Sequence, residues 1–286
     1  MVHRSISVVF LLLFCAGCNA PVSKATAQLV SAGDTVTVTD VRFPSKSIGG
    51  MFRYRAIVPK GGASERFPVL YLLHGAGGGP DETTERTEVV RLAGAQRLIV
   101  VMPAAERSYY TNAKHRRNAR WEDAMASELP LDVEARFPVM TGREHTGIAG
   151  ISMGGYGAVK LALKHPEQYG FAGSMSGALD ITRRAPSLRR AFQTWNIWSI
   201  FGVRSSTRQD EDVFVLLDRM PNGQNIKWFE SCGQNDPLHA VNARFVRLLR
   251  ARGASVDGIT TPGGHGWQSW NAAMPQLFTA AATNLR

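Results

Sequence analysis

The sequence TGIAGISMGGYGAVKLALKH, residues 146–165, decides the fold. It opens with a short apolar run and continues into a segment with helical spacing that stops before Pro166. The junction is a G-x-S-x-G motif, Gly150-Ile151-Ser152-Met153-Gly154. A serine placed between a strand and a helix in this motif is typical of a nucleophile elbow, a strained turn that exposes the hydroxyl. Ser152 is therefore predicted to be a nucleophile; the alternative is a glycine-rich turn without a catalytic role.

Short apolar runs recur on both sides of this motif. They occupy residues 69–73, 98–102, 171–175 and 226–231. Such runs indicate strands that are covered on both faces. Segments with helical spacing at 121–137 and 237–252 lie between them, and Pro130 is expected to break or kink the first. The alternation predicts an α/β protein with a mostly parallel central sheet and helices on both faces.

Two further segments precede this pattern. Residues 35–43 alternate Val and Thr, and residues 51–58 form a second apolar run. A turn at Gly49-Gly50 separates them, so they are expected to pair as antiparallel neighbours.

Residues 180–220 interrupt the alternation. They are basic and rich in aromatic side chains, and they are expected to pass over the carboxyl edge of the sheet. The segment is either a partial lid or a pair of helices that only packs on the surface. Four aromatic residues, Tyr109, Tyr110, Trp195 and Trp198, are candidates for lining an aromatic-friendly substrate pocket, although they could equally be core.

A serine nucleophile needs a base, because its hydroxyl is only weakly nucleophilic at neutral pH. After a nucleophile elbow, the acid and then the histidine follow the serine along the chain. His265 stands in the glycine-rich loop 262–267, from which it can return to the nucleophile, whereas His239 lies just inside a predicted helix. His265 is the predicted base, with His239 as the alternative.

The acid is expected in the loop after the strand at 226–231. Asp236 is the single carboxylate of that loop, residues 232–236. It would orient His265 and stabilise the imidazolium that forms during attack. Asp257 is the alternative, but it stands just before another predicted strand. Without catalysis, Asp236 would serve as the N-cap of the helix that begins at Pro237.

A tetrahedral intermediate also needs backbone donors for its oxyanion. One is expected to be the amide of Met153, directly after the nucleophile. The other is expected from the glycine-rich loop 74–79, with Ala76 preferred and Gly75 second, because glycines permit close backbone approach. His74, at the end of the preceding strand, is predicted to be a structural turn residue.

The N-terminus is predicted to be an export signal. A short basic start precedes an apolar run at 7–14 that is too short to span a bilayer. Cleavage could follow Ala25-Thr26-Ala27. Alternatively, Cys15-Ala16-Gly17-Cys18 resembles a bacterial lipobox that would attach Cys18 to a membrane, with Cys15 where such signals usually have Leu. The expected division is a signal at 1–27, a linker at 28–34 and a catalytic domain at 35–286, in a periplasmic, secreted or membrane-anchored bacterial protein.

The composition limits the remaining function classes. The formal charge is +10, with basic clusters at 114–120 and 183–190. These clusters are interpreted as solvated surface, or else as attraction to anionic envelope polymers or an acidic substrate. No motif supports nucleic-acid binding. The three cysteines imply no disulfide framework, and no metal-ligand spacing is present, so no cofactor or metal is expected.

A set of motifs in this order resembles one family. The motifs are Tyr71-Leu72-Leu73-His74-Gly75, Trp121-Glu122-Asp123 with the helix to Phe137, Gly150 to Gly155, Cys232-Gly233 with Asp236, and Gly263-Gly264-His265 with Trp267. Over roughly residues 35–285 the chain resembles the α/β-hydrolase esterases that include esterase D, S-formylglutathione hydrolases, feruloyl esterases and antigen 85 mycolyltransferases.

The resemblance implies an α/β-hydrolase fold and a triad of Ser152, Asp236 and His265. Many members carry an acidic residue after the histidine, where this chain has Gly266. Glu122 and Asp123 match a helix segment of the family and are expected to be structural. The predicted function is a serine carboxylic ester hydrolase that acts through an acyl-enzyme on a small or phenolic acyl ester. The alternatives are an acyltransferase of the antigen 85 type and a non-catalytic binding protein.

Overall fold

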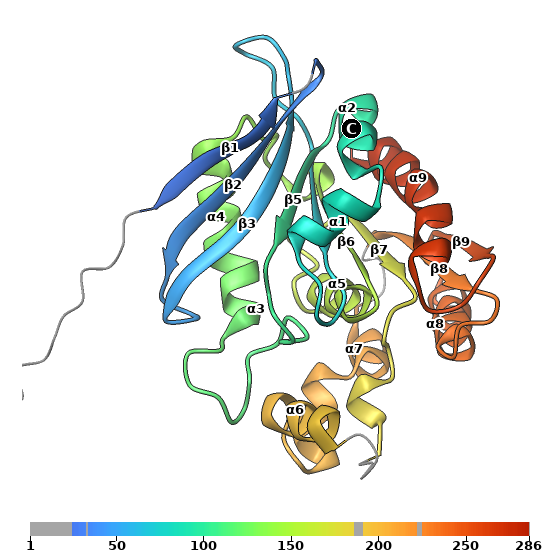
Figure 1. Ribbon diagram of the computed structural model, residues 1–286. Coiled ribbons are helices and arrows are strands. Elements are labelled where there is room, and N and C mark those ends of the chain that lie inside the picture. Colours follow the sequence, from blue (N-terminus) through green and yellow to red (C-terminus); the bar gives the residue numbers. More distant parts are fainter. Residues whose placement is uncertain (1–24, 33, 186–190, 222–224, 286) are drawn as a thin grey trace, which may run out of the picture.

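The computed structural model describes residues 25–32, 34–185, 191–221 and 225–285 (Figure 1). Within these residues nine strands form one sheet in the order β1-β2-β3-β5-β4-β6-β7-β8-β9. The strands are β1 (Thr26–Ala32), β2 (Val36–Ser45), β3 (Gly50–Pro59), β4 (Val69–Leu73), β5 (Ile99–Pro103), β6 (Thr146–Ile151), β7 (Phe171–Met175), β8 (Lys227–Gly233) and β9 (Val256–Thr261). The first three are antiparallel, as is the β3–β5 pair, and β4 to β9 pair in parallel. The predicted mostly parallel sheet is confirmed.

Helices cover both faces of this sheet. They are α1 (Pro80–Arg86), α2 (Val89–Gln96), α3 (Trp121–Asp123), α4 (Leu129–Arg136), α5 (Met153–Lys164), α6 (Ala191–Phe201), α7 (Val213–Arg219), α8 (His239–Ala251) and α9 (Trp267–Asn284). One core contains apolar residues of α4, α5, α7 and α8, and the other those of α2 and α9 (Figure 1). In β4, Tyr71 and Leu73 face the first core and Leu70 and Leu72 the second. Burial on both faces explains why β4 is apolar throughout.

The helix expected at 121–137 is divided into three pieces. A π-helical turn, Ala124–Glu128, joins α3 to α4, and the Leu129 N–H bonds to the Ala124 carbonyl, five residues back. Pro130 lies in the first turn of α4. Proline has no N–H to donate to the carbonyl four residues before it, so regular α-helical bonding is interrupted here. The π-helical turn lies just before Pro130, at the place where the sequence predicted a break or kink.

Strand β1 occupies most of the segment that was expected to be a linker at 28–34. It pairs antiparallel with β2, with Leu29 opposite Thr39. The side chains of 25–29 are exposed, so the strand is held by backbone hydrogen bonds and leaves no apolar pattern in the sequence. The apolar run, Cys15 and Cys18 lie outside the described residues, and the Ala25-Thr26-Ala27 site lies at the start of β1.

The excursion between β7 and β8 contains α6, a 3₁₀ segment at Ser205–Glu211 and α7. Helix α7 packs on α5 and buries Phe214 and Leu217 in the core. Helix α6 packs on the loop that follows the carboxyl end of β5, where the Asn196 side-chain amide donates to the Arg107 carbonyl at 3.2 Å. Both parts of the excursion therefore pack on the fold, and α6 lies at the carboxyl edge of the sheet.

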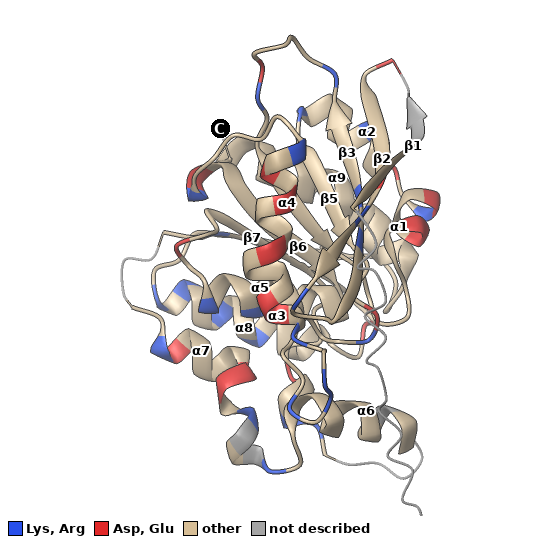
Figure 2. Ribbon diagram, turned by 90° about the vertical axis from the view of Figure 1, so that its left-hand side faces the viewer, with Lys and Arg blue, Asp and Glu red and all other residues tan. Residues whose placement is uncertain are grey.

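Acidic and basic side chains gather on different elements (Figure 2). Acidic residues follow the helical segment from α3 to α4, and arginines follow α8. In the described part of the chain, no helix is long and apolar enough to cross a membrane.

Strand β8 carries a carboxyl group into the core. Glu230 is 2 % exposed and lies in register with Ser174 of β7. Burial raises the pKa of Glu230 well above its ordinary value, because a charged carboxylate loses its hydration there. The carboxyl therefore stays protonated to a higher pH than an exposed glutamate does.

This raised pKa makes stability depend on pH. The neutral form stabilises the fold fully below the pKa of an unfolded glutamate, about 4.3, and that contribution is lost as the pH rises toward the raised value. Glu230→Gln, which cannot ionise, is expected to match the wild type in free energy of unfolding near pH 4.5 and to exceed it at pH 8. Urea denaturation at both pH values measures the free energy of unfolding, with Glu134→Gln at an exposed position of α4 as the surface control. If the free energy of unfolding changed equally between the two pH values in the wild type and in Glu230→Gln, the raised pKa of Glu230 would be contradicted.

Candidate functional site

Ser152 lies between the last residue of β6 and the first residue of α5. Its backbone has φ 55° and ψ −109°, in the positive-φ region that non-glycine residues rarely adopt. The Ser152 N–H donates to the Met175 carbonyl at 2.9 Å, which ties the turn to the neighbouring strand β7.

The turn is tight because small residues meet across it. A Cβ on Gly154 would lie 2.1 Å from the Leu73 carbonyl oxygen, and one on Gly150 would lie 2.3 Å from the Gly154 carbonyl carbon. Larger side chains at these two positions would push α5 away from the strands. The glycines of the motif therefore hold the serine in the strained turn.

His265 and Asp236 complete a line of hydrogen bonds from Ser152. Ser152 Oγ lies 2.8 Å from His265 Nε2, and His265 Nδ1 lies 2.8 Å from Asp236 Oδ2. The Asp236 side chain is fully buried, and its other oxygen accepts the Leu238 N–H at 2.8 Å. A carboxylate only accepts, so Nδ1 carries the proton and Nε2 is free to accept from the serine hydroxyl.

The alternative residues lie apart from this line. His239 begins α8, and its N–H donates to the backbone carbonyl of Asp236 at 2.9 Å. Asp257 lies within β9 and is exposed. Cys232 is buried near Asp236; burial, and then the nearby negative charge, raise the pKa of its thiol to about 12. The thiol is therefore neutral beside the triad.

The loop after β4 approaches Ser152 from the other side. A Cβ on Gly75 would lie 3.6 Å from the Ser152 Cβ. The Gly75 carbonyl accepts the Gly78 N–H at 3.1 Å and contacts His74 Nδ1 at 2.7 Å. In a trans peptide the next N–H points opposite to the carbonyl, so the Ala76 amide faces away from these contacts. The Met153 amide belongs to the first turn of α5, where N–H groups have no intrahelical acceptor.

The His74 side chain is buried beneath this loop, and both of its ring nitrogens make hydrogen bonds. Its Nε2 accepts the Ala105 N–H at 2.9 Å, so Nδ1 is the protonated nitrogen that donates to the Gly75 carbonyl. Burial lowers the pKa of His74, which keeps the ring neutral. These contacts agree with the expected structural role.

The four aromatic candidates divide between core and surface. Tyr109 and Tyr110 are buried in the core, where the ring of Tyr110 lies under α5. Tyr110 therefore does not line a pocket. Trp195 is 58 % exposed on α6, and Trp198 is half-buried on the same helix.

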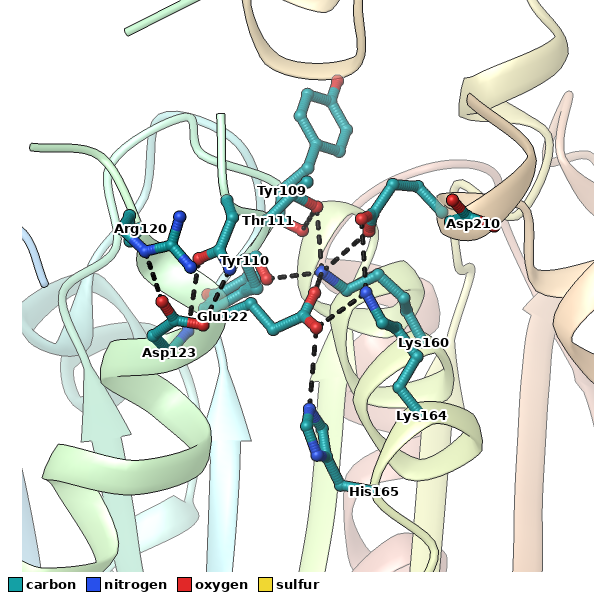
Figure 3. A network of polar contacts seen from close by, with 12 residues as sticks. Tyr109, Tyr110, Thr111, Arg120, Glu122, Asp123, Lys160, Lys164, His165 and Asp210 are labelled. Carbon is teal, nitrogen blue, oxygen red and sulfur yellow. Dashed lines mark hydrogen bonds and ion pairs between the residues drawn. The ribbon is translucent and has the colours of Figure 1, made fainter. Parts of the chain in front are cut away.

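A buried network of charged groups lies behind α5, and the sequence analysis missed most of it (Figure 3). Lys160 Nζ is fully buried and lies 2.7 Å from Glu122 and 3.3 Å from Glu211. Lys164, one turn later, contacts the same two carboxylates at 2.7 and 3.2 Å. Burial opposes ionisation, yet the positive charge of Lys160, with the His165 ring at 3.6 Å and the close contacts of both lysines, holds the pKa of Glu122 well below its usual range.

One signal in the sequence could have revealed this network. Lys160 stands in the run Ala158-Val159-Lys160-Leu161-Ala162, where every neighbour is apolar. A lysine that is buried with such a run is expected to be paired with an acidic group inside the core.

Comparison with known proteins places the chain in a family. A model of the family described as "Putative esterase" matches residues 45–280. An acetyl esterase of Caldicellulosiruptor saccharolyticus is 29% identical over 222 residues, which are 75% of this chain and 83% of the relative. The diacylglycerol acyltransferase/mycolyltransferase Ag85A of Mycobacterium gordonae is 26% identical over 278 residues, 83% of this chain and 78% of that protein.

Solved structures share the fold. The fluorophosphonate-binding serine hydrolase FphF of Staphylococcus aureus superposes with a TM-score of 0.76 at 24% identity, covering 87% of this chain and 99% of FphF. This likeness confirms the α/β-hydrolase fold. Because the family model covers most of the chain, including the elbow, Asp236 and His265, the protein belongs to this esterase family of α/β-hydrolases.

Proposed function

We propose that the protein is a serine esterase that hydrolyses a carboxylic ester through an acyl-enzyme on Ser152. The observation that carries this proposal is the pair of 2.8 Å contacts that link Ser152, His265 and Asp236 across three loops. Such an arrangement activates a serine, because the imidazole accepts its proton and the buried carboxylate stabilises the imidazolium.

The reaction follows from this geometry. His265 Nε2 takes the proton of Ser152 Oγ as that oxygen attacks the ester carbonyl. The amides of Met153 and Ala76 are proposed to bind the oxyanion of the tetrahedral intermediate. His265 then donates the proton to the leaving alcohol, which leaves an acyl-serine. Water repeats the sequence, losing its proton to His265, and releases the acid and the free serine. Acid and alcohol thus account for all atoms of ester and water, and no cofactor takes part.

The proposed substrate is a small or phenolic acyl ester. Supporting this, one relative is named as an acetyl esterase, and a neighbour at a TM-score of 0.74 is named as a ferulic acid esterase. Trp195 and Trp198 on α6 place aromatic surface at the carboxyl edge of the sheet, where such a substrate would approach. Rates on acetyl, butyryl, longer acyl, feruloyl and thioester substrates would identify the acyl group.

Export is part of the proposal. The support is the basic start and apolar run of residues 1–27, with Cys18 as a possible site of a lipid anchor. We place the enzyme in the periplasm, outside the cell or on a membrane surface, with an ester on a small molecule or a polymer as its partner.

The nucleophile can be tested directly. A fluorophosphonate is expected to add its mass to Ser152 in the wild type. Ser152→Ala is expected to block labelling and to remove at least about 3 kcal/mol of transition-state stabilisation, more than a hundredfold in kcat/KM, on an activated ester. Mass spectrometry measures the labelling, and steady-state kinetics measure the loss of kcat/KM. Unchanged turnover in Ser152→Ala would refute the nucleophile, and an unlabelled, inactive wild type would favour a binding protein.

The acid can be tested against the alternative carboxylate. Asp236→Asn keeps the shape of the side chain but no longer stabilises the imidazolium, so kcat is expected to fall between about 10²- and 10⁴-fold. Asp257→Asn removes an exposed carboxylate and is the matched control, with expected activity within twofold of wild type. The assignment fails if Asp257→Asn causes the larger loss.

The competing function is acyl transfer to an alcohol, which the name of the Ag85A relative raises. Both reactions share the acyl-serine, so only the acceptor distinguishes them. With an activated ester and added glycerol, free acid is expected as the main product, and chromatography of the products measures it. Predominant acylation of the added alcohol would replace the hydrolase assignment.

A further inference from the structure

The loop after β5 has a strained backbone at two consecutive residues. Tyr109 and Tyr110 are consecutive residues with positive φ, 53° and 54°. Side chains with a Cβ disfavour this region, and aromatic side chains rarely adopt it. Strain of this kind persists only where the surroundings fix it, and it is concentrated at functional sites.

Lys160 provides that support from inside the core. Its Nζ donates to the Tyr110 carbonyl at 2.7 Å and to Thr111 Oγ1 at 3.0 Å (Figure 3). The ammonium group reaches these acceptors without exposure to water, because Glu122 and Glu211 balance its charge. Lys160 therefore holds the loop through the backbone carbonyl of Tyr110. A substitution of the tyrosine side chain would leave this hydrogen bond in place.

The side chain of Tyr110 connects this loop to α5 and to the loop beside Ser152. Its ring lies against α5, where a Cβ on Gly157 would come within 2.4 Å of it. Its hydroxyl donates to the His74 carbonyl at 3.0 Å. The same loop holds the other end of His74, since the Ala105 N–H donates to the imidazole at 2.9 Å. Residue 74 is thus held at its backbone and at its ring.

His74 begins the loop that approaches Ser152. Its ring donates to the Gly75 carbonyl, and the orientation of that peptide sets the direction of the Ala76 N–H. We propose that Tyr110, fixed by Lys160, is a positioning residue that holds the Gly75–Ala76 peptide in place to bind the oxyanion. This inference rests on the proposed function, because it gives the network a role in the reaction at Ser152.

Tyr110→Phe tests the contact while it preserves the ring. Loss of the hydroxyl frees the His74 carbonyl, so kcat on an activated ester is expected to fall about tenfold, less than when an oxyanion donor is removed. KM is expected to stay within twofold, since the loss falls on the transition state. The second-order rate of fluorophosphonate labelling should fall by a similar factor, because the tetrahedral phosphorus adduct uses the same amides.

Tyr54→Phe is the matched control. Tyr54 is also fully buried, and its hydroxyl donates to Asp132 of α4 at 2.7 Å and not to the loop after β4. It is expected to lower the melting temperature about as much as Tyr110→Phe while kcat and labelling stay at the wild-type level. If Tyr110→Phe retains wild-type kcat, or if both variants lose kcat in step with melting temperature, the positioning role is excluded.

The part played by Lys160 needs a milder variant than its removal. Lys160→Met would leave the carboxylates of Glu122 and Glu211 with only Lys164 to balance them in this network, and is expected to destabilise the fold strongly. Glu122→Gln retains Lys160 and weakens its hold, so a roughly threefold loss of kcat is expected. Because both act through Tyr110, the double variant should lose no more than Tyr110→Phe alone. Multiplied losses would show that the network does not act through Tyr110.

The failure of this inference can be told from failure of the proposed function. A wild type that neither hydrolyses esters nor takes up the fluorophosphonate at Ser152 would overturn the function itself. A labelled, active wild type together with an equally active Tyr110→Phe would overturn the positioning role alone.

Discussion

The close contact between strand β6 and helix α5 is the constraint on which the rest of this structure depends. Gly150 and Gly154 meet where any Cβ would collide with backbone, and Ser152 is therefore held at φ 55° between them. The strained turn places the hydroxyl beyond the end of the strand, where loops from other strands can reach it. Asp236 and His265 arrive on the loops after β8 and β9, and the loop after β4 arrives from the opposite side.

A second contact, on the far side of α5, keeps that helix in register with its surroundings. Two lysines one turn apart bind two glutamates from α3 and from the segment before α7. Removing four charged groups from water is unfavourable unless their hydrogen bonds are satisfied, and such networks favour one arrangement over near alternatives. Here the arrangement joins the excursion 180–220 to the helix that begins at the nucleophile. The described parts of the excursion therefore contribute to the core, for example through Ile200 of α6 and Phe214 of α7.

The sequence predicted the parts of the fold that depend on local pattern. Apolar runs located β4 to β8, because burial on both faces favours apolar residues at most positions. The order of Ser152, Asp236 and His265 predicted three residues that the structure brings within hydrogen-bond distance. Strand β1 was not predictable in this way, because exposed residues paired through the backbone carry no period. Nor was the role of Tyr110, which depends on a buried contact with a loop thirty-six residues earlier.

The order of the elements along the chain has a consequence for when the enzyme becomes active. The base, the last strand and α9 all come from the end of the chain, and α9 packs against β7, β8 and β9. The Leu285 carbonyl also contacts His145, at the start of the strand that leads to Ser152. During synthesis, an emerging chain can form the elbow long before it has a base to activate the serine. Ser152 is therefore not activated until His265 has been synthesised and the loop after β9 has reached the elbow.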